Sequence, residues 1–129
     1  MSKRGLTILF VEPDQHTVQT CRHALDKDKY KIIHVYTVDD AYTAVKESVI
    51  DLVIISTGTE GIDAFCTFRE LRRINPAVSG ILLVAEQDKS LVFEAMNNRF
   101  IGVLEAPVES DIFIEKITEM ADVLELRED

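Results

Sequence analysis

The sequence predicts one α/β domain, because short apolar segments alternate with longer amphipathic segments along its 129 residues. The short segments are rich in Ile, Val and Leu with little polar alternation, which is typical of parallel strands covered on both faces. The breakers Pro13, Asn75-Pro76 and Pro107 fall between the segments rather than inside them. Together these observations favour five successive strand–helix units that form a single sheet.

The five predicted strands are apolar runs that each end before a turn. They cover residues 6–12, 31–36, 52–56, 80–85 and 101–104. In sheets of this kind, ligands bind beyond the carboxyl ends of the strands. We therefore expect any chemistry of this domain in the turns that follow Val11, Ile55, Val84 and Leu104.

Between the strands, apolar residues recur at spacings of three and four, which predicts helices with one apolar face. The defining positions are Val18, Cys21 and Leu25, then Ala41, Ala44 and Val45, then Phe65, Phe68 and Leu71, then Leu91, Val92, Ala95 and Met96. The last helix is expected to begin at a Ser110 cap and to bury Phe113, Ile117, Met120, Ala121 and Leu124. Its charged end, 125–129, has no stop signal, which fits either a domain cut from a longer chain or an ordinary frayed terminus.

Composition narrows the class of function. The net charge is −9, from 14 basic and 23 acidic residues, which disfavours direct binding to nucleic acid or to anionic membrane surfaces. No apolar run approaches the roughly 18 residues that span a bilayer, and the polar amino terminus does not fit a secretory signal, so we expect a soluble cytoplasmic domain. Cys21 and Cys66 are isolated in predicted helices, so we expect buried, reduced thiols and neither a disulfide nor a metal site.

The order and spacing of these elements resemble the receiver domains of response regulators over about residues 6–125. The resemblance is carried by five segments: 8–14 (the acidic first turn), 51–56, 60–64, 81–85 and 104–107. It implies a flavodoxin-like (βα)5 three-layer sandwich with parallel strand order 2-1-3-4-5. It also implies a single receiver-like domain over 1–129 with a role in two-component signal transduction.

The positions that carry the family's chemistry are altered. The resemblance places Ser56 where a phospho-accepting aspartate is expected, and a serine hydroxyl is a poor nucleophile unless a base activates it. The family's acidic pair becomes Glu12-Pro13, followed by Asp14, so one expected cation ligand has no side-chain oxygen. We expect Glu12 and Asp14 to be solvated or helix-capping residues rather than metal ligands.

Three further positions depart from the pattern. Val84 stands at the hydroxyl position that responds to phosphorylation, Val103 at the aromatic position of the fifth strand, and Ala106 at the lysine that neutralises the phosphoryl group. Each change removes a different requirement of phosphoryl transfer. We therefore expect no phosphotransfer, no catalytic activity, and neither a metal nor a cofactor.

The resulting prediction is a degenerate receiver domain that acts as a phosphorylation-independent interaction module for an attached or separate output domain. By resemblance, the interaction surface lies on the fourth helix, fifth strand and fifth helix, which also serve in dimerisation. Phe93, Phe100 and Phe113 are the aromatic candidates there, with core burial as the alternative for each and the favoured one for Phe113.

Two other functions remain open at this point. The first is a phosphorelay receiver with a substitute acceptor, such as Asp63 or a kinase-modified Ser56, although Asp63 lies seven residues beyond the strand end. The second is a small flavodoxin-like cofactor-binding protein. The first turn opposes it, because acids and a proline stand where a phosphate needs free backbone N–H donors.

Overall fold

The computed structural model describes residues 5–12, 14–57, 63–85 and 90–127. Five parallel strands form one sheet in the order β2-β1-β3-β4-β5, as predicted. The strands are β1 Leu6–Val11, β2 Tyr30–Val35, β3 Leu52–Ser56, β4 Ser79–Ala85 and β5 Gly102–Ala106. Each predicted strand boundary lies within two residues of the observed one.

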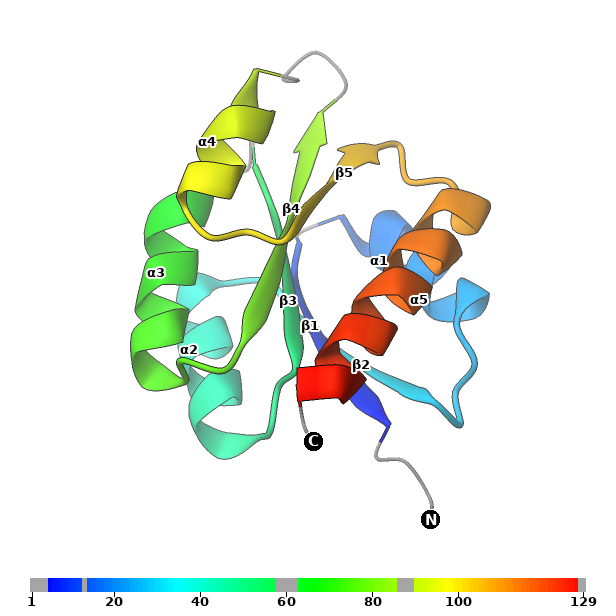
Figure 1. Ribbon diagram of the computed structural model, residues 1–129, viewed down its shortest axis with the longest axis horizontal. Helices are drawn as coiled ribbons and strands as arrows, with labels where there is room; N and C mark the ends of the chain where they lie inside the picture. Colours follow the sequence, from blue (N-terminus) through cyan, green and yellow to red (C-terminus); the bar gives the residue numbers. More distant parts are fainter. Residues whose placement is uncertain (1–4, 13, 58–62, 86–89, 128–129) are drawn as a thin grey trace.

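Five helices cover the two faces of this sheet and make the predicted three-layer sandwich. They are α1 Gln15–Ala24, α2 Val38–Glu47, α3 Ala64–Ile74, α4 Leu91–Asn97 and α5 Ser110–Arg127. Figure 1 shows α2, α3 and α4 on one face and α1 and α5 on the other. Within the described residues, no helix is both long enough and apolar enough to cross a membrane.

Two large clusters of buried side chains, and a small third one of Leu6, Ala121 and Leu124, fill the spaces between the sheet and its helices. Alternate residues of β1 point to opposite faces, so Leu9 and Val11 join the cluster under α2, α3 and α4, whereas Ile8 and Phe10 join the one under α1 and α5. Fully burying such a side chain contributes about 1.5–3 kcal/mol. The strands therefore contribute buried residues to the core on both sides of the sheet.

The three aromatic candidates for the interaction surface differ in how far their side chains are exposed. Phe93 is 81% exposed, which suits a contact residue. Phe100 is only 4% exposed, and its ring stacks on Phe68 with 4.3 Å between centroids, so its assignment to the surface was wrong. Phe113 is fully buried, with its ring centroid 6.1 Å from that of Phe10, which confirms the core alternative.

The short helix α4 is covered on one side only. Ala95 is its buried residue, whereas Val92 and Met96, which the predicted apolar stripe included, are 37% and 67% exposed. The start of α5 also differs from the prediction. Ser110 is its first helical residue rather than its cap, because the Glu109 carbonyl already accepts a hydrogen bond from the Phe113 amide.

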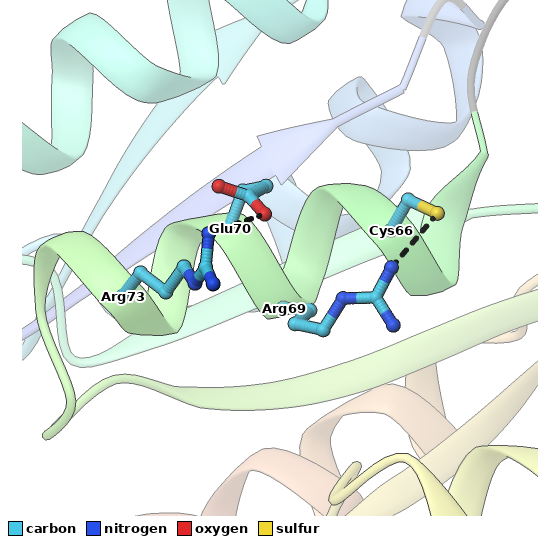
Figure 2. A network of polar contacts seen from close by, with 4 residues as sticks. All are labelled: Cys66, Arg69, Glu70 and Arg73. Carbon is cyan, nitrogen blue, oxygen red and sulfur yellow. Dashed lines mark hydrogen bonds and ion pairs between the residues drawn. The ribbon is translucent and has the colours of Figure 1, made fainter.

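The outer surface of α3 carries a polar row, drawn in Figure 2. Cys66 is exposed there, against the prediction, and the Arg69 Nη2 lies 3.2 Å from its sulfur. Arg73 pairs with Glu70 at 3.4 Å, one helical turn away, and both side chains are largely solvated. Exposed ion pairs of this kind contribute about 0–1 kcal/mol. Cys21, in contrast, is buried as predicted, and its burial raises the pKa of the thiol to about 12.

Candidate functional site

The candidate site lies at the carboxyl edge of the sheet, where the strand ends meet. Ser56 is the last residue of β3, and Glu12 directly follows β1. The final residues of β4 and β5, Ala85 and Ala106, are Cα partners in the ladder. Because parallel strands share their direction, these residues gather at one edge, at the top of Figure 1.

Glu12 is buried, with 5% of its surface exposed, so the expectation of a solvated residue was wrong. Its Oε1 accepts a hydrogen bond from the Asp14 amide at 3.0 Å. Burial raises the pKa of the Glu12 carboxyl above its ordinary value of 4.5, opposed by hydrogen bonds from the Asp14 amide and the Ser56 side chain and by the nearby His34. The carboxylate therefore belongs to the protein interior and not to the solvated turn.

The half-buried Ser56 hydroxyl faces two acceptors. Its Oγ donates to the Thr57 carbonyl at 3.1 Å, and its hydrogen bond with Glu12 lowers the pKa of that carboxyl. A serine hydroxyl carries one hydrogen, so the two acceptors compete for it. The next residue is anchored to β4, because the Thr57 amide donates to the Leu83 carbonyl at 2.8 Å. Ser56 is thus held by ordinary structural hydrogen bonds.

Asp14 caps α1, which confirms one of the two roles expected of it. Its Oδ1 accepts from the His16 amide at 3.0 Å, and its Oδ2 accepts from the Thr17 hydroxyl at 2.7 Å. The Thr17 hydrogen bond is the main reason that the pKa of Asp14 is lowered. Pro13, the middle residue of the degenerate acidic turn, lies outside the described residues.

Val84, which is expected at the hydroxyl position, is a core residue. It is 1% exposed and packs in the core under α2, α3 and α4. Neighbouring residues of a strand point to opposite faces, and the next residue, Ala85, is partly exposed beside Ala106. Neither residue carries a hydroxyl. Val103 is half-buried against the same core cluster as Val84.

The substitute acceptor considered from the sequence has a structural role. Asp63 caps α3, and its Oδ1 accepts hydrogen bonds from the amides of Phe65 and Cys66, both at 3.1 Å. These hydrogen bonds, led by that from Cys66, lower the pKa of Asp63. In the ranges that the structure describes, no three His, Cys, Asp or Glu side chains lie close enough to hold a metal ion.

A hollow of about 420 Å³ opens beside these strand ends. It is lined by Asp14, His16, Thr17, Thr20, Ala85, Ala106, Pro107 and Val108. No lysine or arginine is among these residues, and the Ala106–Pro107 peptide bond beside them is cis. The sequence alone located this edge, but it missed the burial of Glu12 and the contact between Glu12 and Ser56.

Known proteins resemble this chain in sequence and in fold. The transcriptional regulatory proteins ZraR of Salmonella typhimurium and Salmonella typhi are each 25% identical to it over 111 residues, which is 86% of this chain and 25% of theirs. The chain thus spans about a quarter of the length of these curated relatives.

Solved structures share the whole fold. A response regulator from Thermotoga maritima superposes with a TM-score of 0.81 at 23% identity, covering 89% of this chain and 96% of its own. The signal receiver domain of an HD domain-containing protein from Pseudomonas fluorescens Pf-5 gives a TM-score of 0.86 at 18% identity, covering 99% and 95%. The model of the response regulator receiver domain matches residues 8–118, and the chain therefore belongs to the receiver domain family.

Proposed function

We propose that this receiver domain acts without phosphorylation, as a regulatory module that contacts an output domain or another protein. Ser56 carries the proposal. It occupies the end of β3, where the resemblance expects the acceptor aspartate, and its hydroxyl is bonded to the Thr57 carbonyl. A carboxylate attacks phosphorus directly to form an acyl phosphate, whereas a hydroxyl needs an activating base.

The neighbouring strand ends support the same conclusion. Phosphoryl transfer relies on positive charge against the developing oxyanions, and Ala106 offers none. Val84, which is expected at the position of the switch hydroxyl, and its neighbour Ala85 have no side-chain group that could hydrogen-bond a phosphoryl oxygen. Among the described residues of this edge, the positions expected to carry the acceptor aspartate, the switch hydroxyl and the lysine therefore carry Ser56, Val84 and Ala106.

The two alternatives have less support. Asp63 is engaged as the cap of α3, so its use as an acceptor would cost that helix its cap, about 0.5–2 kcal/mol. A kinase-modified Ser56 stays open to test. No observation favours a cofactor-binding protein, and the family match argues for signalling.

The surface for contact is the one formed by α4, β5 and α5. Of the eight large apolar side chains that stand out as exposed among the described residues, six lie between 92 and 114 along the chain: Val92, Phe93, Met96, Ile101, Ile112 and Ile114. Ile114 is two residues from Ile112 on α5 and faces another side of that helix, so the other five are the candidates for this surface. Exposed apolar groups that gather on one surface often mark interaction sites. An attached or separate output domain is the proposed occupant, with a second copy of the chain as the alternative.

Phosphorylation is the direct test. The purified domain is incubated with radiolabelled acetyl phosphate and Mg²⁺, beside the Thermotoga maritima response regulator as a positive control. We expect no label on the wild type and none on Asp63→Asn, but acid-labile label on the variant Pro13→Asp/Ser56→Asp/Ala106→Lys, which restores the cation ligand, the acceptor and the lysine. Label on the wild type that Asp63→Asn abolishes would overturn the proposal in favour of a substitute acceptor.

A further inference from the structure

The face that carries the exposed apolar residues is also acidic. We call it the outer-edge face and define it by Val92, Phe93, Met96, Ile101 and Ile112 together with Glu105, Glu109 and Glu119, all of which are exposed. β5 is the last strand of the sheet, with α4 on one side and α5 on the other (Figure 1). The face therefore follows one free edge of the sheet.

A hollow of about 450 Å³ lies on this face, between β5 and the start of α5. Its apolar lining includes Val103, Val108 and Ile112, and the charged residues Glu105, Glu109 and Lys116 belong to the same lining. Two acids and one lysine leave the hollow with a net negative charge, which suits an apolar side chain that is flanked by positive charge.

The acidity is concentrated in this part of the chain. Residues 91–122 contain seven acidic and two basic residues, so about a quarter of the sequence carries −5 of the net −9. All seven acids are exposed. Asp111, Glu115 and Glu119 follow each other at intervals of four on α5, and each such like-charge pair destabilises a helix by about 0.2–0.5 kcal/mol.

The basic group of α5 that lies on this side neutralises only part of the negative charge of the face. Lys116 lies over β5, where its Cδ would be 3.6 Å from a Cβ placed on Gly102. Helical periodicity sets Lys116 beside Ile112 and Glu119 and away from Asp111 and Glu115. One lysine on this side leaves the face negative.

From these observations, and resting on the proposed function, we infer that the outer-edge face binds a basic segment of another protein that inserts an apolar side chain. Charge complementarity selects this occupant. A second copy is disfavoured, because a two-fold symmetric contact would place the acids of one copy against those of the other. The net charge of −9 also repels a second copy and attracts a basic partner.

Selection from a random peptide library tests the partner's chemistry. Phage-displayed peptides of about 12 residues are panned on the wild-type domain, with counter-selection on Glu105→Lys/Glu119→Lys. We expect the enriched peptides to be net positive and to contain an aromatic or large aliphatic residue. Their affinity, measured by fluorescence anisotropy, should fall at least about tenfold in Glu105→Lys/Glu119→Lys and in Phe93→Ser. It should also weaken between about 50 and 300 mM NaCl.

The matched control is Asp28→Lys/Glu47→Lys, which makes the same charge change at two exposed acids outside this face. It should bind the peptides like the wild type. Enrichment of neutral or acidic peptides, no enrichment, or equal loss of binding in the control would each overturn the inference. Dimerisation in sedimentation equilibrium that Phe93→Ser abolishes would overturn it in favour of a second copy. None of these outcomes depends on phosphorylation. The labelling experiment therefore tests the proposed function separately.

Discussion

Replacing Gly80 by alanine should destabilise the domain, because the strand here runs directly beneath two stacked rings. A Cβ on Gly80 would lie 2.5 Å from Cε1 and Cζ of Phe68 and 3.1 Å from Cδ1 of Phe100. Phe68 has no free space to move into, since it is 1% exposed and its ring stacks on Phe100. The Arg72 Cζ also lies over this ring, 5.9 Å from its centroid. Such overpacking costs about 1–3 kcal/mol, more than the roughly 0.4–1 kcal/mol that alanine gains by restricting the unfolded chain.

Gly102 is the matched control in the same sheet. A Cβ there would meet Lys116 at 3.6 Å and Ile81 at 3.9 Å, which are ordinary van der Waals contacts. Gly102→Ala should therefore range from neutral to about 1 kcal/mol more stable. In the double variant Gly80→Ala/Phe68→Leu, the smaller side chain makes room for the new methyl group. The two changes should couple favourably by about 0.5–3 kcal/mol.

Urea denaturation followed by far-UV circular dichroism measures the wild type, the two glycine variants, Phe68→Leu and the double variant, since the chain has no tryptophan to report by fluorescence. The slope m should stay constant, so that differences in midpoint report stability. If Gly80→Ala were as stable as Gly102→Ala, or if the double variant were simply additive, the packing argument would be refuted.

Three more predictions concern stability. Because burial raises the pKa of Glu12, the folded state binds its proton more tightly than the unfolded chain does, and stability falls as pH rises through that range. The advantage of Glu12→Gln over the wild type should therefore grow from about pH 4 to about pH 7 in urea melts, and growth toward low pH would contradict this. Phe100→Ala should cost about 3–5 kcal/mol and the exposed Phe93→Ala less than about 0.5, and equal effects would contradict the assigned burial. Arg99 has a φ of 70°, a conformation that glycine adopts without strain, so Arg99→Gly should raise the free energy of unfolding by up to about 1 kcal/mol. A lower free energy of unfolding would argue against backbone strain at Arg99.

Several features of the domain followed from local patterns alone. The strands were predictable because each is apolar on both faces, which distinguishes a buried parallel strand from an amphipathic helix. The strand ends that meet at the candidate edge followed from the strand direction and from proline positions. Ser56 and Ala106 were therefore located at this edge before any packing was known.

Side-chain burial at the turns was not predictable in the same way. Phe100 lies between α4 and β5, outside any repeating pattern, and its burial depends on Phe65 and Phe68 of α3. Glu12 lies in the turn between β1 and α1, where no periodic pattern indicates which way a side chain faces. Its neighbour Ser56 is 44 residues away along the chain, so local sequence could not reveal their contact.

The sequence by itself thus determined the order of the elements, the parallel sheet and the absence of an aspartate at position 56. Only the tertiary structure decided that Glu12 is buried and that Phe93 rather than Phe100 is exposed. The reason is physical. Periodicity reports which side of its own element a residue faces, whereas burial depends on which distant segment covers that side.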